Sequence, residues 1–191
     1  GTVNAYLRVA VVALIGLLVA VPAPAAEVAG VGLDDKASLG GQELSLNGAG
    51  VRTRLIFKVY VASLYLPQPA KDLSSVLAKA PRRIQLNLLR TLSADQLVDA
   101  LNEGLEANNS AEELSAVKPQ IDQLSAIMKA FKEIREKDVV VLDFVDGATR
   151  VSWNGQLKGT ISGEAFNRAL TRVWLGDKPV QPDLKQALLG G

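Results

Sequence analysis

The 191-residue chain contains neither cysteine nor histidine. Without cysteine it can form no disulfide and offers no thiol nucleophile, and without histidine it lacks the commonest general base. These two residues also supply most transition-metal ligands. Motifs of the GxSxG, Walker and GxGxxG types are missing as well. The sequence therefore predicts no metal site, no cofactor and no catalytic residue of these kinds.

The chain also has no large excess of positive or negative charge. The chain has 21 basic and 20 acidic residues, for a formal net charge of +1. No basic cluster interrupts this balance, and nucleic-acid-binding domains usually carry such a cluster. We expect no nucleic-acid partner.

The N-terminus has the three regions of a secretory signal. Arg8 precedes an apolar run from Val9 to Val21, and the stretch Ala23-Pro24-Ala25-Ala26 follows. A basic region, an apolar region and an A-x-A site are typical of a signal peptide. The apolar run is short for a bilayer span, so a retained membrane anchor is the less favoured alternative.

These features predict a signal peptide at residues 1–25 and one domain at residues 26–191. The predicted location is the periplasm, and the predicted membrane contact is transient, through the signal peptide alone. Once Arg8 is removed, the remaining chain has equal numbers of basic and acidic residues.

Hydrophobic periodicity predicts strands at both ends of this domain and helices between and after them. We expect a short strand that turns at Asn47-Gly48, a long strand over 48–66, a short helix near 73–79 and a strand over 82–90. Capping signals predict helices after Ser93 and Ser110, and Pro119 opens a third. A three-stranded meander over 138–161, a helix from Ser162 to Gly176 and a last helix over 182–189 complete the pattern. This order is typical of an α+β domain with helices on one face of an antiparallel sheet.

The long strand is unusual because it carries cations. Alternation places Arg52, Arg54, Lys58 and Tyr60 on its even-numbered face, whereas the odd-numbered face is nearly all apolar and is predicted to be core. The even face is either a solvated surface or a site that captures an anion, since arginine suits a carboxylate. Arg52 and Tyr60 would lie roughly 20 Å or more apart along a straight strand, so a joint site requires a bend or bulge.

Three segments together resemble the chalcone isomerase-like family. They are GAGVRTRLIFKVYVASLYL, LSADQLVDALNEGL and NGQLKGTISGEAFNRALTRVWLGDKPVQPDLKQALLG, in the family's order and spacing over residues 48–190. The resemblance implies an open-faced β-sandwich, in which helices cover one side of a large antiparallel sheet and a ligand cleft lies between them.

Plant enzymes of this family use an arginine and a threonine on the long strand, and a tyrosine and an asparagine on the following helix. Arg52, or Arg54 with a shifted gap, keeps the arginine, and Tyr60 stands in the threonine's place. Leu97 occupies the tyrosine position and Gly104 the asparagine position, and neither side chain can form a hydrogen bond. The resemblance therefore favours a protein without catalytic residues.

Fatty-acid-binding members of the family pair the arginine with a tyrosine on this strand. By that resemblance, the head group of a fatty acid or similar apolar carboxylic acid would lie at Arg52, Arg54 and Tyr60. Its tail would lie against Leu97, Leu101 and Trp174. One alternative is an isomerase or lyase acting on an enone-type substrate, with Arg52 as electrophile and Tyr60 as acid. A second is a structural or partner-binding envelope protein without a small ligand.

Overall fold

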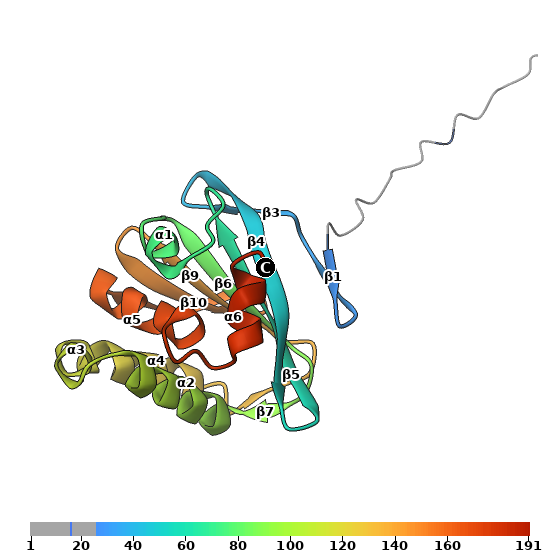
Figure 1. Ribbon diagram of the computed structural model, residues 1–191. Coiled ribbons are helices and arrows are strands. Elements are labelled where there is room, and N and C mark those ends of the chain that lie inside the picture. The colour runs from blue at the N-terminus through green and yellow to red at the C-terminus, as the bar shows by residue number, and fades with distance from the viewer. Residues whose placement is uncertain (1–15, 17–25) are drawn as a thin grey trace, which may run out of the picture.

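The computed structural model of the protein describes Gly16 and residues 26–191. The predicted signal peptide and its cleavage site therefore lie outside the described residues, apart from Gly16 and Ala26. The rest of the chain folds around one large antiparallel sheet with helices on one face (Figure 1). The predicted α+β class and the open-faced β-sandwich are confirmed.

The main sheet has seven strands in the order β11-β10-β9-β6-β5-β4-β3, and all neighbours are antiparallel. Its strands are β3 (Lys36–Leu39), β4 (Gln42–Arg54), β5 (Phe57–Leu66), β6 (Arg82–Leu88), β9 (Val139–Val145), β10 (Ala148–Trp153) and β11 (Gln156–Ser162). Two small pairs accompany it, β1 (Ala26–Val28) with β2 (Val31–Leu33) and β7 (Leu92–Ser93) with β8 (Glu133–Ile134).

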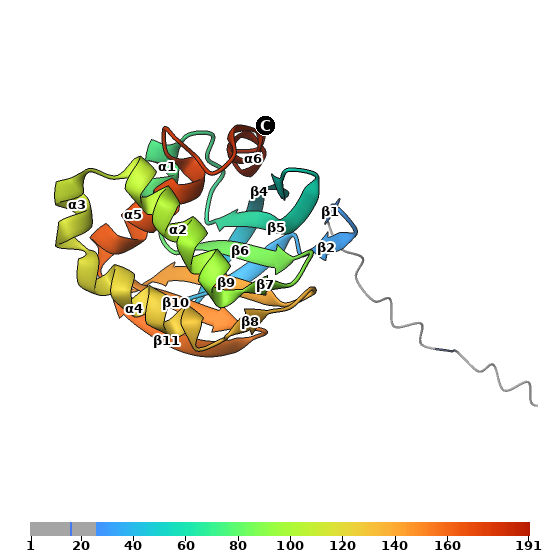
Figure 2. The same ribbon diagram turned by 90° about the horizontal axis from the view of Figure 1, so that it is seen from below.

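The helices lie together on one side of this sheet (Figure 2). They are α1 (Leu73–Leu77), α2 (Ala94–Asn108), α3 (Ala111–Ala116), α4 (Lys118–Lys129), α5 (Glu164–Leu175) and α6 (Pro182–Leu188). The predicted capping boxes at Ser93 and Ser110 both form, with Gln96 and Glu113 as their reciprocal partners. The predicted Ser162 cap does not form, because Gly163 is the residue that precedes α5.

The hydrophobic core lies between the helices and the even-numbered residues of the central strands. Leu64, Ile84 and Leu142 face one another across β5, β6 and β9, and all three are buried in the main core cluster. On the opposite face, Tyr65 of β5 is also buried, in a smaller cluster. The prediction that the odd-numbered face forms the core was therefore wrong, since β5 is covered on both sides and the main core uses its even residues.

The predicted single strand over 48–66 was also wrong. The chain reverses at Leu55-Ile56, so that β4 and β5 form a long hairpin. Neither residue is a usual turn former, and the reversal contains no glycine, proline, asparagine or aspartate that would have predicted a turn. The predicted turn at Asn47-Gly48 is instead a bulge within β4, where the pairing with β5 shifts register.

The packing of α6 on β4 explains that bulge. The Asn47 amide donates to the carbonyls of Ala70 (3.0 Å) and Leu188 (2.8 Å). A Cβ on Gly48 would lie 2.0 Å from the carbonyl oxygen of Ala187 in α6. The Asn-Gly pair therefore permits close contact between a strand and a helix backbone instead of a tight turn.

Candidate ligand-binding site

A pocket of about 460 Å³ lies between the β4–β5 hairpin and the helices. This volume is within the range of about 300–1,000 Å³ that small-molecule sites occupy. Most of its wall is apolar, and its polar side chains include three arginines and a tyrosine. The lining residues are Arg52, Arg54, Leu55, Phe57, Val59, Tyr60, Arg90, Thr91, Leu92, Gln96, Leu97, Ala100, Leu101, Val173 and Val180.

The hairpin brings Arg52 and Tyr60 together. The two residues are paired across β4 and β5, so both side chains leave the same face of the sheet, toward the helices. Directly opposed residues have Cβ atoms about 4.5–5.5 Å apart, so the long separation of a single strand does not apply. Both residues line the pocket.

Arg52 is held at the segment that connects α5 and α6. Its Nη1 donates to the carbonyls of Thr53 (2.9 Å) and Val180 (3.2 Å) and to Gln181 Oε1 (3.3 Å). Among the described residues, Nε and Nη2 of the same guanidinium make no hydrogen bond. Two donor groups of a partly buried cation therefore remain for a ligand.

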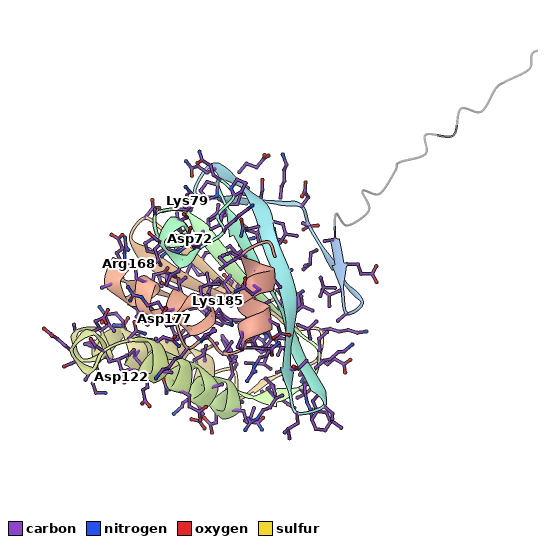
Figure 3. The ribbon with its side chains drawn as sticks, viewed as in Figure 1. Asp72, Lys79, Asp122, Arg168, Asp177 and Lys185 are labelled. Carbon is purple, nitrogen blue, oxygen red and sulfur yellow. The ribbon has the colours of Figure 1, made fainter. Side chains whose placement is uncertain are left out.

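The connecting segment is itself fixed at both sides. Gln181 Nε2 donates to the carbonyl of Val51 (2.9 Å). Lys185, which Figure 3 labels on α6, donates through Nζ to the carbonyl of Gly176 at the end of α5 (3.0 Å). These bonds join α6 to β4 on one side and to α5 on the other. Arg52 is therefore positioned by the helix layer as well as by its own strand.

Tyr60 is buried, with 6% of its surface exposed, and its hydroxyl accepts a hydrogen bond from Trp174 Nε1 (3.0 Å). Since the indole can only donate, the phenol proton is left to be donated elsewhere. Burial raises the pKa of Tyr60, and the bond from Trp174 and the charge of Arg52 oppose that rise. The phenol is thus protonated at neutral pH and is placed as a hydrogen-bond donor.

This raised pKa has a measurable consequence for stability. The pKa of Tyr60 is higher in the folded protein than its ordinary value of 10.0, so the native state binds the proton more tightly than the unfolded chain. The contribution is complete below about pH 10 and is lost as the pH rises. We expect the free energy of unfolding in urea to fall above that pH, and to fall less in Tyr60→Phe.

Tyr65→Phe is the comparison for this experiment. Burial raises the pKa of Tyr65 as well, but the residue lies on the other face of the sheet and donates to the carbonyl of Asp34 (2.8 Å). Each substitution should remove its own part of the alkaline loss. An unchanged loss in Tyr60→Phe would contradict this account.

Arg54 and Arg90 add two further cations to the pocket lining. Arg54 is exposed near the hairpin turn, and Arg90 lies 4.2 Å above the ring of Phe57. Among the residues that the structure describes, no aspartate or glutamate lines the pocket. Arg90 was not among the predicted site residues, because nothing in the local sequence pattern indicates that the end of β6 approaches the hairpin.

The residues predicted to hold an apolar tail are placed in two layers. Leu97 and Leu101 lie on α2 and form part of the pocket wall. Trp174 does not line the pocket, because it is fully buried in α5 behind Tyr60. Its place is therefore behind the pocket wall, where it orients the Tyr60 hydroxyl.

Gly104 is a packing residue between α2 and α5. A Cβ at this position would lie 2.6 Å from Val173 Cγ1, closer than real side chains approach. We expect Gly104→Asn, which restores the asparagine of the plant enzymes, to lower the free energy of unfolding by about 1–3 kcal/mol. The neighbouring exposed residue gives the control, since Glu103→Asn should change stability by less than about 0.5 kcal/mol in the same urea titration. Equal stability of the two variants would contradict the packing role.

Two kinds of feature are absent from Gly16 and residues 26–191. No group of three or more acidic side chains is arranged to hold a metal ion. Over the same residues, no helix combines the length and the hydropathy required to cross a membrane.

Comparison with known proteins supports one relationship. No curated protein matches the chain. A solved structure of a fatty-acid binding protein from Arabidopsis thaliana superimposes with a TM-score of 0.60 at 15% identity, over 80% of this chain and 89% of the plant protein. At that identity, the likeness concerns the fold. A family profile described as chalcone isomerase-like matches residues 25–190. The chain therefore belongs to the chalcone isomerase-like family.

Proposed function

We propose that this protein is an exported, non-catalytic binder of fatty acids or similar apolar carboxylic acids. The observation that carries the proposal is the pocket itself, in which Arg52 and Tyr60 are paired across the hairpin beside an apolar wall. In the described part of the chain, three arginines and no carboxylate line that pocket, so its electrostatic preference is for an anion.

The donors suit a carboxylate. Arg52 offers Nε and Nη2, and Tyr60 offers a phenol proton that no acceptor of the described protein occupies. Hydrogen bonds from a cation to a carboxylate are stronger than those between neutral groups, and the fork of a guanidinium also sets the orientation. The head group would therefore bind at this cross-strand pair.

The apolar wall suits a hydrocarbon tail. Leu97, Leu101 and Val173 form part of it, and each methylene group buried there contributes about 0.8 kcal/mol. The tail would supply most of the affinity, while Arg52 and Tyr60 select the carboxylate. The Arabidopsis protein of the same fold is named as a fatty-acid binding protein, which supports the choice of a fatty acid as ligand.

The geometry gives less support to an enzyme. An isomerase that uses Tyr60 as an acid needs a phenol that gives up its proton readily, and burial raises the pKa of Tyr60. A protein without a small ligand would fill the space with its own side chains, whereas about 460 Å³ is open. We therefore favour the binding protein over both alternatives.

Export and a periplasmic location rest on the sequence of residues 1–25 alone. If they are correct, the protein recovered from the periplasmic fraction of its host begins near Ala26. N-terminal sequencing of that protein tests the cleavage. A chain that still carries Arg8 would favour the retained anchor.

The binding function is tested by calorimetry with decanoic acid and decan-1-ol, which share a chain length and differ in the head group. We expect both to bind, with the acid bound about tenfold or more tightly, since hydrogen bonds to charged groups contribute about 1.5–3 kcal/mol. Mass spectrometry of lipids that co-purify from the native host would then identify the physiological acid. An acid that fails to bind would refute the proposed function.

A further inference from the structure

The tip of the β4–β5 hairpin exposes consecutive large apolar side chains. Leu55 and Ile56 are 90% and 89% exposed, and Phe57 is 48% exposed. In Figure 1 the loop that joins β4 to β5 projects at the lower edge of the molecule. Contiguous apolar exposure of this kind usually marks a surface that contacts something other than water.

The backbone conformation at the tip disfavours the leucine that is found there. Leu55 has a φ of 56°, in the left-handed region where glycine and asparagine are favoured. A hairpin turn needs no apolar side chain at such a position. Leu55 is thus placed here against both solvation and local conformational preference, and Ile56 against solvation, so folding alone does not explain them.

Cations surround this apolar tip. Arg54 and Lys58 flank it in sequence, and Arg90 lies 4.2 Å over the ring of Phe57. Within residues 26–191, none of these three cations forms an ion pair with a carboxylate. Apolar side chains set among unpaired cations match an anionic lipid surface, where the former enter the acyl region and the latter contact the head groups.

The pocket extends to the same tip. Leu55 and Phe57 of the tip and the flanking Arg54 line the pocket, together with Arg52 and Tyr60. A ligand with an apolar tail partitions into bilayers, so a tip seated in a bilayer would place the pocket entrance at the ligand's source. The ligand could then enter without crossing water.

The geometry points to the β4–β5 hairpin tip as a docking element for anionic phospholipid membranes, through which the pocket exchanges its ligand. This contact goes beyond the transient one expected of the signal peptide. The loading step rests on the proposed function, whereas membrane docking itself can be tested without it.

The test compares co-sedimentation of the protein with vesicles of phosphatidylglycerol and phosphatidylcholine and with vesicles of phosphatidylcholine alone. Ile56→Asp is the main variant, because Ile56 is exposed and does not line the pocket. Leu157→Asp is the matched control, since Leu157 is 58% exposed, precedes a lysine and lies on β11.

We expect the anionic vesicles to bind wild-type protein about tenfold or more tightly than the neutral ones, with binding weakened by salt. Ile56→Asp should lower that binding by about tenfold or more, and Leu157→Asp should leave it unchanged. Circular dichroism would establish that both variants are folded. Calorimetry without vesicles should give both variants the wild-type affinity for decanoic acid.

Three outcomes would overturn the docking proposal. They are no preference for anionic vesicles, an equal loss in the two aspartate variants, and binding of the tip to a protein partner in place of lipid. A protein that binds vesicles but not decanoic acid would instead refute the proposed function and leave docking intact.

Discussion

Replacing Arg52 with alanine is expected to weaken the binding of decanoic acid by about 10- to 100-fold, because a hydrogen-bonded charge is lost from the head-group position. The affinity for decan-1-ol should change far less, since that ligand carries no charge. Calorimetry with the two ligands separates a head-group effect from general damage to the pocket.

Three further variants sharpen this experiment. Arg52→Lys keeps the charge but loses the fork, so its loss should be intermediate. Tyr60→Phe removes the second donor and should weaken the binding of decanoic acid more than the binding of decan-1-ol. Arg135→Ala removes an exposed arginine that does not line the pocket and should have no effect. Equal losses for acid and alcohol in Arg52→Ala would contradict head-group recognition.

Replacing Gly48 with alanine is expected to have the largest effect on stability. The new Cβ would lie 2.0 Å from the carbonyl oxygen of Ala187 and 2.6 Å from that of Leu188. Both are backbone atoms of the last turn of α6 and cannot move aside alone. We expect the free energy of unfolding in urea to fall by about 3 kcal/mol or more, at the upper end of the costs of overpacking.

Gly50→Ala is the graded control on the same strand. Its Cβ would lie 2.9 Å from Ala187 Cβ and 3.0 Å from Leu184 Cδ1, so the contacts are longer than at Gly48 and the leucine can change its rotamer. The loss should be smaller than for Gly48→Ala. Equal losses, or a stable Gly48→Ala, would show that α6 does not approach β4 as closely as described.

Capping boxes and turn dipeptides predicted most of the fold, because each is a strong local signal in the sequence. The capping boxes at Ser93 and Ser110 define the starts of α2 and α3. The turns at Asp146-Gly147 and Asn154-Gly155 separate β9, β10 and β11 as expected. In each case a side chain or a glycine has a local role that tertiary packing does not override.

The β4–β5 hairpin could not be predicted in the same way. Leu55 and Ile56 continue the apolar pattern of a strand, and the true turn adopts a conformation that leucine rarely takes. Conversely, Asn47-Gly48 is a strong turn signal that the chain uses for contact with α6. Both predictions failed because tertiary contacts at these positions outweigh the local conformational preference of the residues.

The composition of the candidate site was only partly predictable for a related reason. The sequence selected Arg52, Arg54, Tyr60, Leu97 and Leu101, and the structure places all five around one pocket. Arg90 was missed because it follows β6 and is distant in sequence from the β4–β5 hairpin. Trp174 was selected as a contact for the tail, and its bond to the Tyr60 hydroxyl follows only from the packing of α5 on the sheet.

The central claim is that the cross-strand pair of Arg52 and Tyr60 holds a carboxylate inside the pocket. A crystal structure of the complex with decanoic acid tests it most directly. We predict both carboxylate oxygens within about 3.2 Å of donors on Arg52 and Tyr60, with the tail against Leu97 and Leu101. A carboxylate bound away from this pair, or a pocket that stays empty at saturating acid, would contradict the account.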